Sequence, residues 1–277
     1  MATCALIRHR SLLILHPTNN RISMANNFEN FILEKVINSN DVLIVLGSRP
    51  AMGKTTFLIT VAKYLAIDRD IPTAVFSLEM SKKQVDRRLF SVVANLSGEK
   101  FYHDDWSPEE KVKITSFKEY ISSKPLYIDD TAGLDISEMK IRLKKLVNEN
   151  GVRFVLIDYL HLINASDEKI REKQLRYICQ IRKDATKALH VTIILASQCH
   201  RSISSKTRII PTLEDLSLSS EDIIDDVWLL YRPSYYKIFE DEQGNDVTNI
   251  ADLHLYKGGK KVSEEKFIFD ISIPKFI

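Results

Sequence analysis

A run of small, basic and hydroxyl residues near the start of the chain has the composition of a phosphate-binding loop. Residues 47–56 read Gly-Ser-Arg-Pro-Ala-Met-Gly-Lys-Thr-Thr, a loop of the G-x-x-x-x-G-K-S/T type. The glycines let backbone N–H groups turn onto phosphate oxygens, and a helix N-terminus adds partial positive charge. Lys54 can reach the β- and γ-phosphates, and the Thr55 hydroxyl can ligate Mg²⁺. The bland alternative is a glycine-containing turn that binds nothing.

The neighbouring sequence favours the phosphate loop over that alternative. An apolar strand candidate, residues 42–46, precedes it, and a helical run, residues 56–65, follows it. This strand–loop–helix order is the context in which such a motif binds a nucleotide. The residues that we expect to contact the phosphates are Gly47, Ser48, Arg49, Pro50, Ala51, Met52, Gly53, Lys54, Thr55 and Thr56.

Three more polar residues stand at or just past the ends of apolar strand candidates. Asp158 is placed to hold Mg²⁺ through water beside Thr55, and Glu79 is placed to polarise a water molecule for hydrolysis. The Gln198 amide is placed to sense the γ-phosphate. Each has a structural alternative: a turn aspartate, a glutamate stabilised by a helix dipole, and a hydrogen-bonding strand-end amide.

The elements that must position these residues alternate between strand and helix. Apolar strand candidates separated by amphipathic helices predict an α/β fold with a mostly parallel central sheet, covered by helices on both faces. The last two strand candidates, residues 252–256 and 266–271, have no helix between them, so we expect an antiparallel edge there. Open sheets of this kind place ligands at the carboxyl ends of their strands, where the four candidate regions lie.

Bulk composition excludes several classes of protein. The 277 residues are 44% hydrophobic and 27% charged, which is ordinary for a globular domain. A net charge of +2 gives no global basic field, so nucleic acid would have to bind a local patch or an assembled ring. The three cysteines show neither metal spacing nor a disulfide framework, and no apolar run could span a membrane. We therefore expect a cytoplasmic protein that does not enter membranes.

The chain divides into three parts. Residues 1–26 lack periodicity and predict a disordered tail, within which Met24 is an alternative start to Met1. Residues 27–40 predict a short helix that either serves as a linker-like element or covers its own core. Residues 41–277 form the predicted nucleotide-binding domain.

Several motifs in order resemble those of one family. The segments are the phosphate loop, Phe-Ser-Leu-Glu-Met-Ser at 76–81, Pro-Leu-Tyr-Ile-Asp-Asp-Thr at 125–131, Leu-Ile-Asp-Tyr-Leu at 156–160, Ala-Ser-Gln at 196–198 and Tyr-Arg-Pro-Ser-Tyr-Tyr at 231–236. Together they resemble the C-terminal, RecA-like P-loop NTPase domain of the DnaB-type replicative helicases. The resemblance implies ATP and Mg²⁺ as cofactors, with Glu79 and Lys54 in catalysis, Asp158 as the Walker B residue and Gln198 as the phosphate sensor. It also implies a hexameric ring on single-stranded DNA, with other replication proteins as partners.

This chain departs from the family pattern in three places. Only the residues before Asp41 precede the domain, so we expect the family's N-terminal helical domain to be absent. The family's trans-acting cations follow a Lys-x-Arg pattern, and here Lys257 matches the lysine while Gly259 stands in the arginine position. Lys260 or Lys261 is a candidate substitute, but a lysine lacks the guanidinium fork, so we expect weak turnover. The alternative is a solvated Gly-Gly turn with ordinary surface lysines.

The third departure concerns DNA. The region between residues 216 and 231 is acidic, which does not favour phosphate binding. We therefore expect DNA to contact the polar loops after Asp158 and Gln198, whose candidate residues are Arg171, Lys173, Arg201, Lys206 and Arg208.

These features support an ATP-dependent DNA helicase or translocase domain that acts as a ring. The alternative is a non-motor ATP-binding accessory or regulatory protein of the same fold that acts in replication. A small-molecule kinase is disfavoured because no acceptor-binding lid is recognisable.

Overall fold

A computed structural model describes residues 27–39, 41–97, 99–100, 106–158, 191–199, 210–216 and 224–277. The helices are α1 (Phe28–Ile32), α2 (Lys54–Ala62), α3 (Lys82–Ala94), α5 (Pro108–Ser122) and α6 (Ile136–Asn150). π-helical turns extend α1 over Leu33–Ile37 (η2) and α2 over Lys63–Asp68 (η3), and 3₁₀ turns cover Leu213–Leu216 (η6) and Pro233–Tyr236 (η7). No helix of these ranges is long and apolar enough to cross a membrane. The tail predicted for residues 1–26 lies outside the described residues.

The described strands form one nine-stranded sheet. They are β1 (Leu43–Ser48), β2 (Thr73–Ser77), β3 (Leu126–Asp129), β4 (Phe154–Asp158), β5 (Thr192–Gln198), β6 (Asp226–Tyr231), β7 (Ile250–Lys257), β8 (Lys260–Asp270) and β9 (Lys275–Phe276). Their order is β3-β2-β4-β5-β1-β6-β7-β8-β9. The strands from β3 to β6 pair in parallel, and those from β6 to β9 pair antiparallel. The predicted mostly parallel sheet with an antiparallel edge is confirmed.

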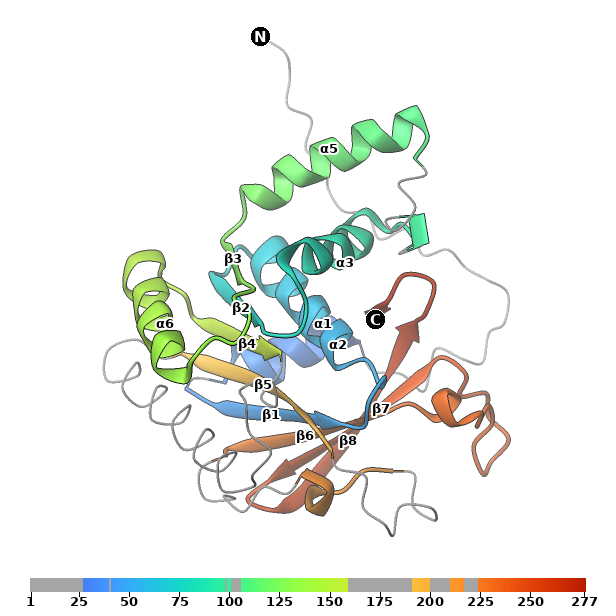
Figure 1. Ribbon diagram of the computed structural model, residues 1–277. Helices are drawn as coiled ribbons and strands as arrows, with labels where there is room; N and C mark the ends of the chain where they lie inside the picture. The colour runs from blue at the N-terminus through green and yellow to red at the C-terminus, as the bar shows by residue number, and fades with distance from the viewer. Residues whose placement is uncertain are drawn as a thin grey trace.

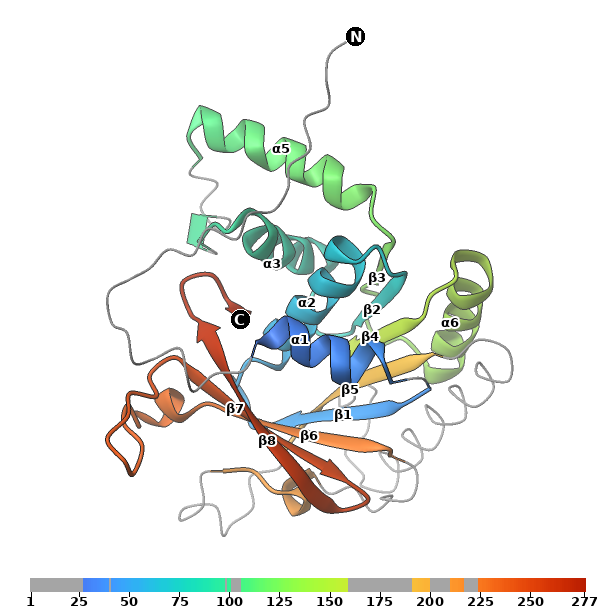
Figure 2. The ribbon, with the colours of Figure 1, turned by 180° about the vertical axis from the view of Figure 1, so that it is seen from behind.

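Helices cover both faces of the sheet, and β1 shows why its sequence is wholly apolar. Ile44 and Leu46 join one buried cluster with α1 and α2, whereas Leu43 and Val45 join another with α6. Because successive side chains of a strand point to opposite faces, a strand buried on both faces must be apolar at every position. Figures 1 and 2 show α2 against the sheet, α3 beyond it and α5 outermost, with α6 on the opposite face.

The short helix at the start of the described chain packs on its own domain. Phe28 and Phe31 are nearly fully buried. The Phe28 ring lies 5.1 Å from that of Phe57 on α2 and 5.2 Å from that of Phe267 on β8. Its apolar face is therefore occupied by the core of the same chain.

The chain ends in a strand that the sequence analysis did not predict. The Phe276 ring of β9 lies 5.3 Å from Phe57, 5.5 Å from Phe28 and 5.1 Å from Phe269. The Phe276 N–H points to the Thr60 hydroxyl on α2 at 3.3 Å. This two-residue strand braces the helix that follows the phosphate loop.

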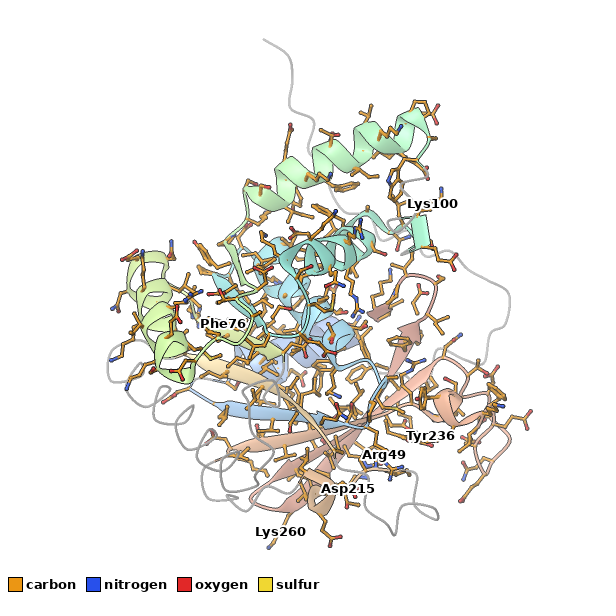
Figure 3. The ribbon with its side chains drawn as sticks, in the orientation of Figure 1. Arg49, Phe76, Lys100, Asp215, Tyr236 and Lys260 are labelled. Carbon is orange, nitrogen blue, oxygen red and sulfur yellow. The ribbon has the colours of Figure 1, made fainter. Side chains whose placement is uncertain are left out.

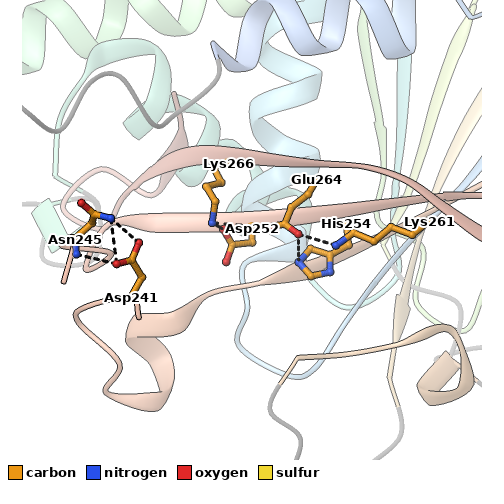
Figure 4. A network of polar contacts seen from close by, with 7 residues as sticks. All are labelled: Asp241, Asn245, Asp252, His254, Lys261, Glu264 and Lys266. Atoms are coloured by element: carbon orange, nitrogen blue, oxygen red, sulfur yellow. Dashed lines mark hydrogen bonds and ion pairs between the residues drawn. The ribbon is translucent and has the colours of Figure 1, made fainter. Parts of the chain in front are cut away.

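Polar side chains tie the antiparallel strands together (Figure 4). Lys266 pairs with Asp252 across β7 and β8 at 2.9 Å, and Glu264 contacts both His254 at 3.5 Å and Lys261 at 2.6 Å. Charged side chains on strands near a sheet edge discourage pairing with another chain. They also link β7 to β8 in the hairpin that carries Lys257 and Lys260.

We predict that Phe276→Ala lowers the free energy of unfolding by about 3–5 kcal/mol, because it opens a cavity among three aromatic rings. Urea denaturation of the full chain measures the loss. Phe239→Ala is the matched control, since the Phe239 side chain is 51% exposed, and its cost should stay below about 1 kcal/mol. Equal losses in the two variants would contradict a bracing role for β9.

Candidate active site

One cavity brings together the polar residues predicted from four separate segments. It has a volume of about 470 Å³ and is lined by phosphate-loop residues together with Glu79, Asp158 and Gln198. All of them lie at the carboxyl edge of the parallel strands, where α/β sheets place ligands. The geometry therefore agrees with the predicted location, while the role of each residue stays a prediction.

The pairing register of the parallel strands causes this convergence. Ser48 at the end of β1 is level with Gln198 at the end of β5. Ser77 at the end of β2 is level with Asp158 at the end of β4. The Leu78 N–H then donates to the Asp158 carbonyl at 2.7 Å, which brings the Glu79 segment to the same edge.

The lysine of the loop is held back against the end of β1. Lys54 Nζ donates to Ser48 Oγ at 3.0 Å and lies 3.4 Å and 3.5 Å from the carbonyl oxygens of Ser48 and Arg49. Burial lowers the pKa of Lys54, and the nearby charges of Cys199, Asp158 and Glu79 partly oppose this effect. The Lys54 ammonium is bonded only to the neutral oxygens of Ser48 and Arg49, so it can leave them to bind a phosphate.

The first glycine of the loop has a different role from the one predicted. Five residues separate Gly47 from Gly53, so Ser48, not Gly47, occupies the first position of the G-x-x-x-x-G-K-S/T pattern. A Cβ built on Gly47 would lie 2.6 Å from a Leu216 methyl group. Gly47 is therefore required for packing under η6, and the loop begins with a serine whose hydroxyl accepts from Lys54.

The second glycine does meet the demands of a phosphate loop. Gly53 caps α2 with φ of 99°, in the left-handed region that favours glycine. A Cβ there would lie 3.3 Å from the Phe269 ring, so space is also restricted. Ala51 has φ of 61°, an uncommon backbone conformation for a residue with a side chain. The loop is thus bent tightly around the N-terminus of α2.

The hydroxyl and carboxylate predicted to hold a metal ion lie side by side. The Thr55 side chain hydrogen bonds to Asp158, which is 4% exposed. Burial raises the pKa of Asp158, and Glu79 adds to this, while Thr55, Lys54 and Arg88 oppose it. Among the described residues no group of three or more His, Cys, Asp or Glu side chains could form a metal cage. One carboxylate and one hydroxyl suit Mg²⁺, which prefers oxygen ligands and completes its shell with phosphates and water.

The other two predicted residues differ in exposure. Glu79 lies in the segment after β2 and is exposed, so its carboxylate is accessible to solvent in the cavity. Gln198 is half-buried at the end of β5. Both face the cavity that Lys54 enters.

The cavity also contains residues that the sequence analysis did not select. Arg87 and Arg88 reach it from α3, and Arg232 reaches it from the segment after β6. The Arg232 guanidinium lies 3.8 Å above the Phe269 ring, and burial lowers the pKa of Arg232. Arg232 could have been predicted from the sequence, because it directly follows a strand. Arg87 and Arg88 could not, because the local sequence does not show which face of α3 meets the cavity.

The two candidate trans-acting lysines lie at the opposite end of the sheet. Lys257 ends β7, Lys260 begins β8, and the two form a register pair around a two-residue turn. Lys257 is level with Asp226 at the start of β6, and its ammonium lies 4.0 Å from that carboxylate. Figure 3 shows Lys260 at the tip of this hairpin, away from Arg49 of the phosphate loop. Neither lysine can serve the cavity of its own chain.

The turn between the two lysines has a geometry that favours glycine. Gly258 and Gly259 have φ of 53° and 74°. Positive φ at both central residues is the geometry of a type I′ hairpin turn, which strongly prefers glycine at the second. An arginine at position 259 would be strained in this hairpin. The DNA candidates Arg171, Lys173, Arg201, Lys206 and Arg208 all lie outside the described residues.

Comparison with known proteins gives consistent matches. A profile of the family described as the DnaB-like helicase C terminal domain matches residues 33–275. Replicative DNA helicase DnaC of Bacillus subtilis is 32% identical over 198 residues, covering 70% of this chain and 44% of the relative. Replicative DNA helicase DnaB of Geobacillus stearothermophilus is 31% identical over 212 residues, covering 75% and 46%. A probable replicative DNA helicase of Trieres chinensis is 32% identical over 240 residues, covering 84% and 52%. The chain thus spans about half the length of these curated relatives.

Two solved structures are similar in fold. One is a DnaB-like replicative helicase whose structure was described with its interactions with primase. It has a TM-score of 0.72 and 26% identity, covering 86% of this chain and 57% of that one. The other is an ATPase domain with a TM-score of 0.71 and 27% identity, covering 86% of this chain and 85% of that one.

We predict that Asp158→Asn raises the free energy of unfolding at neutral pH, because it removes the cost of burying a charge. The folded-state pKa of Asp158 lies above its unfolded value, so this cost is absent where both states are protonated and complete above the folded pKa. The gain should therefore grow as the pH rises through the interval between the two values. Urea denaturation between about pH 4 and 8 measures it.

Glu79→Gln is the control, because it makes the same carboxylate-to-amide change at an exposed position of the same cavity. Its gain in the free energy of unfolding at neutral pH should be smaller than that of Asp158→Asn, because it relieves only the repulsion between Glu79 and Asp158 and no burial of a charge. A loss of stability in Asp158→Asn at neutral pH would mean that the contacts with Thr55, Lys54 and Arg88 outweigh the cost of burial.

Proposed function

The chain belongs to the family of DnaB-like helicase C-terminal domains, and from this premise we propose that it is an ATP-hydrolysing DNA helicase or translocase domain. The single observation that carries the proposal is the convergence of the phosphate loop, Glu79, Asp158 and Gln198 in one cavity. These segments are far apart in the sequence, and sheet register alone brings them together. A fold without a nucleotide would have no need to gather an ammonium, two carboxylates and an amide at one edge.

The polyphosphate of ATP binds the loop and the N-terminus of α2. Backbone N–H groups around Gly53 and the Lys54 ammonium hold its oxygens. Lys54 exchanges its weak contacts with Ser48 and Arg49 for the phosphates. Thr55 and Asp158 are the residues that would hold Mg²⁺, which supplies charge neutralisation for the phosphates when bound.

Hydrolysis needs a group that orients the attacking water, and Glu79 is the residue proposed for this step. Its exposed carboxylate borders the cavity, and no pairing with a described side chain commits it elsewhere. Gln198 is proposed to contact the γ-phosphate. Gln198 also ends the strand that leads into the region of Arg201, Lys206 and Arg208, which supports coupling between hydrolysis and DNA.

The nucleobase is proposed to occupy the side of the cavity formed by Arg232, Phe269, Ile271 and Pro274. Arg232 already stacks on Phe269, so the base would lie on the free face of this pair rather than between its members. Stacking contacts accept any planar base, so we expect the site to discriminate little among the four nucleobases.

A ring of subunits completes the site. Lys257 and Lys260 lie too far from the cavity of their own chain to act there, which supports a role in the cavity of a neighbour. Ring assembly, single-stranded DNA as the bound polymer, other replication proteins as partners and a cytoplasmic location are parts of the same proposal. The match to a helicase studied with primase supports a replication partner.

One observation favours the alternative of a non-motor ATP-binding protein. The φ of 74° at Gly259 disfavours an arginine there, where the resemblance leads us to expect the trans-acting guanidinium, and a lysine at position 260 offers a point charge without the planar fork. In this alternative the chain binds ATP tightly, turns it over slowly and regulates a replication protein.

We predict that Glu79→Gln keeps ATP affinity and loses at least about 100-fold in turnover, because only the water-polarising carboxylate is removed. Steady-state phosphate release and equilibrium nucleotide binding measure the two quantities on the same preparation. Unchanged turnover in the variant would favour the non-motor alternative.

We predict that Lys257→Ala impairs ATP turnover only in the assembled state. Turnover is measured across a protein concentration series with DNA present, and light scattering reports assembly in parallel. Lys113→Ala is the control, since it removes an exposed lysine from α5, away from the hairpin. An equal loss at concentrations where the protein is monomeric would contradict a trans role.

A further inference from the structure

One segment that the sequence analysis singled out has no part in the lining of the cavity. Residues 125–131 read Pro-Leu-Tyr-Ile-Asp-Asp-Thr and run through β3, at one edge of the sheet, and just past its end (Figure 1). Asp129 is level with Phe76 of β2, so Asp130 follows at the carboxyl edge of the sheet. Because β2 leads into the segment that carries Glu79, Asp130 lies beside that segment without lining the cavity.

The backbone of the Glu79 segment is fixed on both sides of Glu79. The Leu78 N–H donates to the Asp158 carbonyl at 2.7 Å, and the Ser77 hydroxyl donates to the Met80 carbonyl at 2.7 Å. The Glu79 side chain itself is exposed. Backbone contacts, rather than burial of the side chain, therefore determine where its carboxylate lies.

The start of α3 continues this restraint. Ser81 and Gln84 form a capping box around the first turn. The first N–H groups of a helix have no acceptor within the helix, and Asp130 supplies one of the missing acceptors. The Lys82 N–H donates to Asp130 Oδ2 at 2.6 Å, between residues that are 48 positions apart in the chain. This bond ties the end of the Glu79 segment to the edge strand β3.

The turn that presents Asp130 is held by an arginine of another helix. Arg142 Nη1 of α6 donates to Asp129 Oδ2 at 2.8 Å and to Thr131 Oγ1 at 2.6 Å. The Thr131 N–H also donates to Asp129 Oδ1 at 3.0 Å. Asp130 thus stands between two residues that are anchored to α6, on one face of the sheet, while its own carboxylate anchors α3 on the other.

We propose that Asp130 is a positioning residue for ATP hydrolysis, because its bond to the Lys82 N–H holds Glu79 where the Glu79 carboxylate can orient the attacking water. The proposal rests on the proposed function and adds to it the strand-end segment 125–131. A shift of about 1 Å in a catalytic group is enough to slow a reaction strongly. Loss of the Lys82–Asp130 bond leaves the junction between the Glu79 segment and α3 free to shift.

The test is ATP turnover by the full chain with Asp130→Ala, measured beside its affinity for a non-hydrolysable ATP analogue. The turnover number should fall roughly 10- to 100-fold, because Glu79 is displaced, while the dissociation constant stays within about twofold. The unchanged affinity also shows that the variant is folded. Unchanged turnover, or a loss of affinity as large as the loss of turnover, would overturn the proposal.

Asp130→Asn separates the hydrogen bond from the charge. The amide oxygen of asparagine can still accept from the Lys82 N–H. Turnover should therefore stay close to that of the unmodified protein and well above that of Asp130→Ala. Turnover as low as in Asp130→Ala would overturn the proposal, because the charge rather than the acceptor would then be responsible.

Asp241→Ala is the matched control. The Asp241 carboxylate also accepts a backbone N–H, that of Asn245 at 2.8 Å, in a turn that does not line the cavity (Figure 4). Its turnover should match that of the unmodified protein. An equal fall in Asp241→Ala and Asp130→Ala would overturn the proposal, because any lost backbone contact of this kind would then have the same effect.

Combination with Glu79→Gln tests whether Asp130 acts through Glu79. The Glu79→Gln protein lacks the carboxylate that Asp130 is proposed to position, so adding Asp130→Ala should lower the residual turnover no further. A full additional loss in the double variant would overturn the proposal.

The Glu79→Gln protein also separates a failure of this proposal from a failure of the proposed function. If Glu79→Gln loses turnover but Asp130→Ala does not, only the role of Asp130 is wrong. If the unmodified protein has no turnover, or Glu79→Gln leaves it unchanged, the proposed hydrolysis is wrong and the role of Asp130 is wrong with it.

Discussion

The register of the parallel strands is the constraint on which the rest of this structure depends. β1, β5, β4 and β2 end at one edge, with Ser48 level with Gln198 and Ser77 level with Asp158. A slip of one residue would exchange Ile44 and Leu46 with Leu43 and Val45 between the two buried clusters, so the packing of these clusters holds the register. The core thus determines where the polar strand ends meet, and any change that altered the register would disperse the cavity.

The surrounding elements act on the two ends of that sheet differently. At the carboxyl edge, α2 and β9 brace the phosphate loop through the rings of Phe57 and Phe276. At the other edge, the hairpin turn at Gly258 and Gly259 presents two lysines to solvent, held by cross-strand ion pairs. The cavity and the two lysines therefore lie at opposite ends of the strands.

Local patterns in the sequence predicted most of this arrangement. The phosphate loop, the strand-end residues Glu79, Asp158 and Gln198, and the antiparallel edge were predicted because each depends on nearby residues or on strand order. The prediction that Gly47 is the first residue of the motif is wrong. Gly47 is needed because a Cβ there would clash with Leu216, and Ser48 is the first residue of the motif. The arginines of α3 and the strand β9 were missed because helix rotation and a two-residue pairing are set by tertiary packing that no local period reveals. The sequence is compatible with two roles for α1, a linker-like element or a cover for its own core. Local sequence does not decide between them, because α1 packs on Phe57 and Phe267, which lie far along the chain.

We propose that the cavity at the strand ends binds a nucleoside triphosphate through the loop from Ser48 to Thr56. A structure of the full chain with Mg²⁺ and a non-hydrolysable ATP analogue tests this proposal. We expect the β- and γ-phosphates to lie against the N-terminus of α2, within hydrogen-bond distance of Lys54, and a metal ion to lie beside Thr55 and Asp158. Phosphates bound elsewhere, or a cavity that stays empty at saturating analogue, would contradict it.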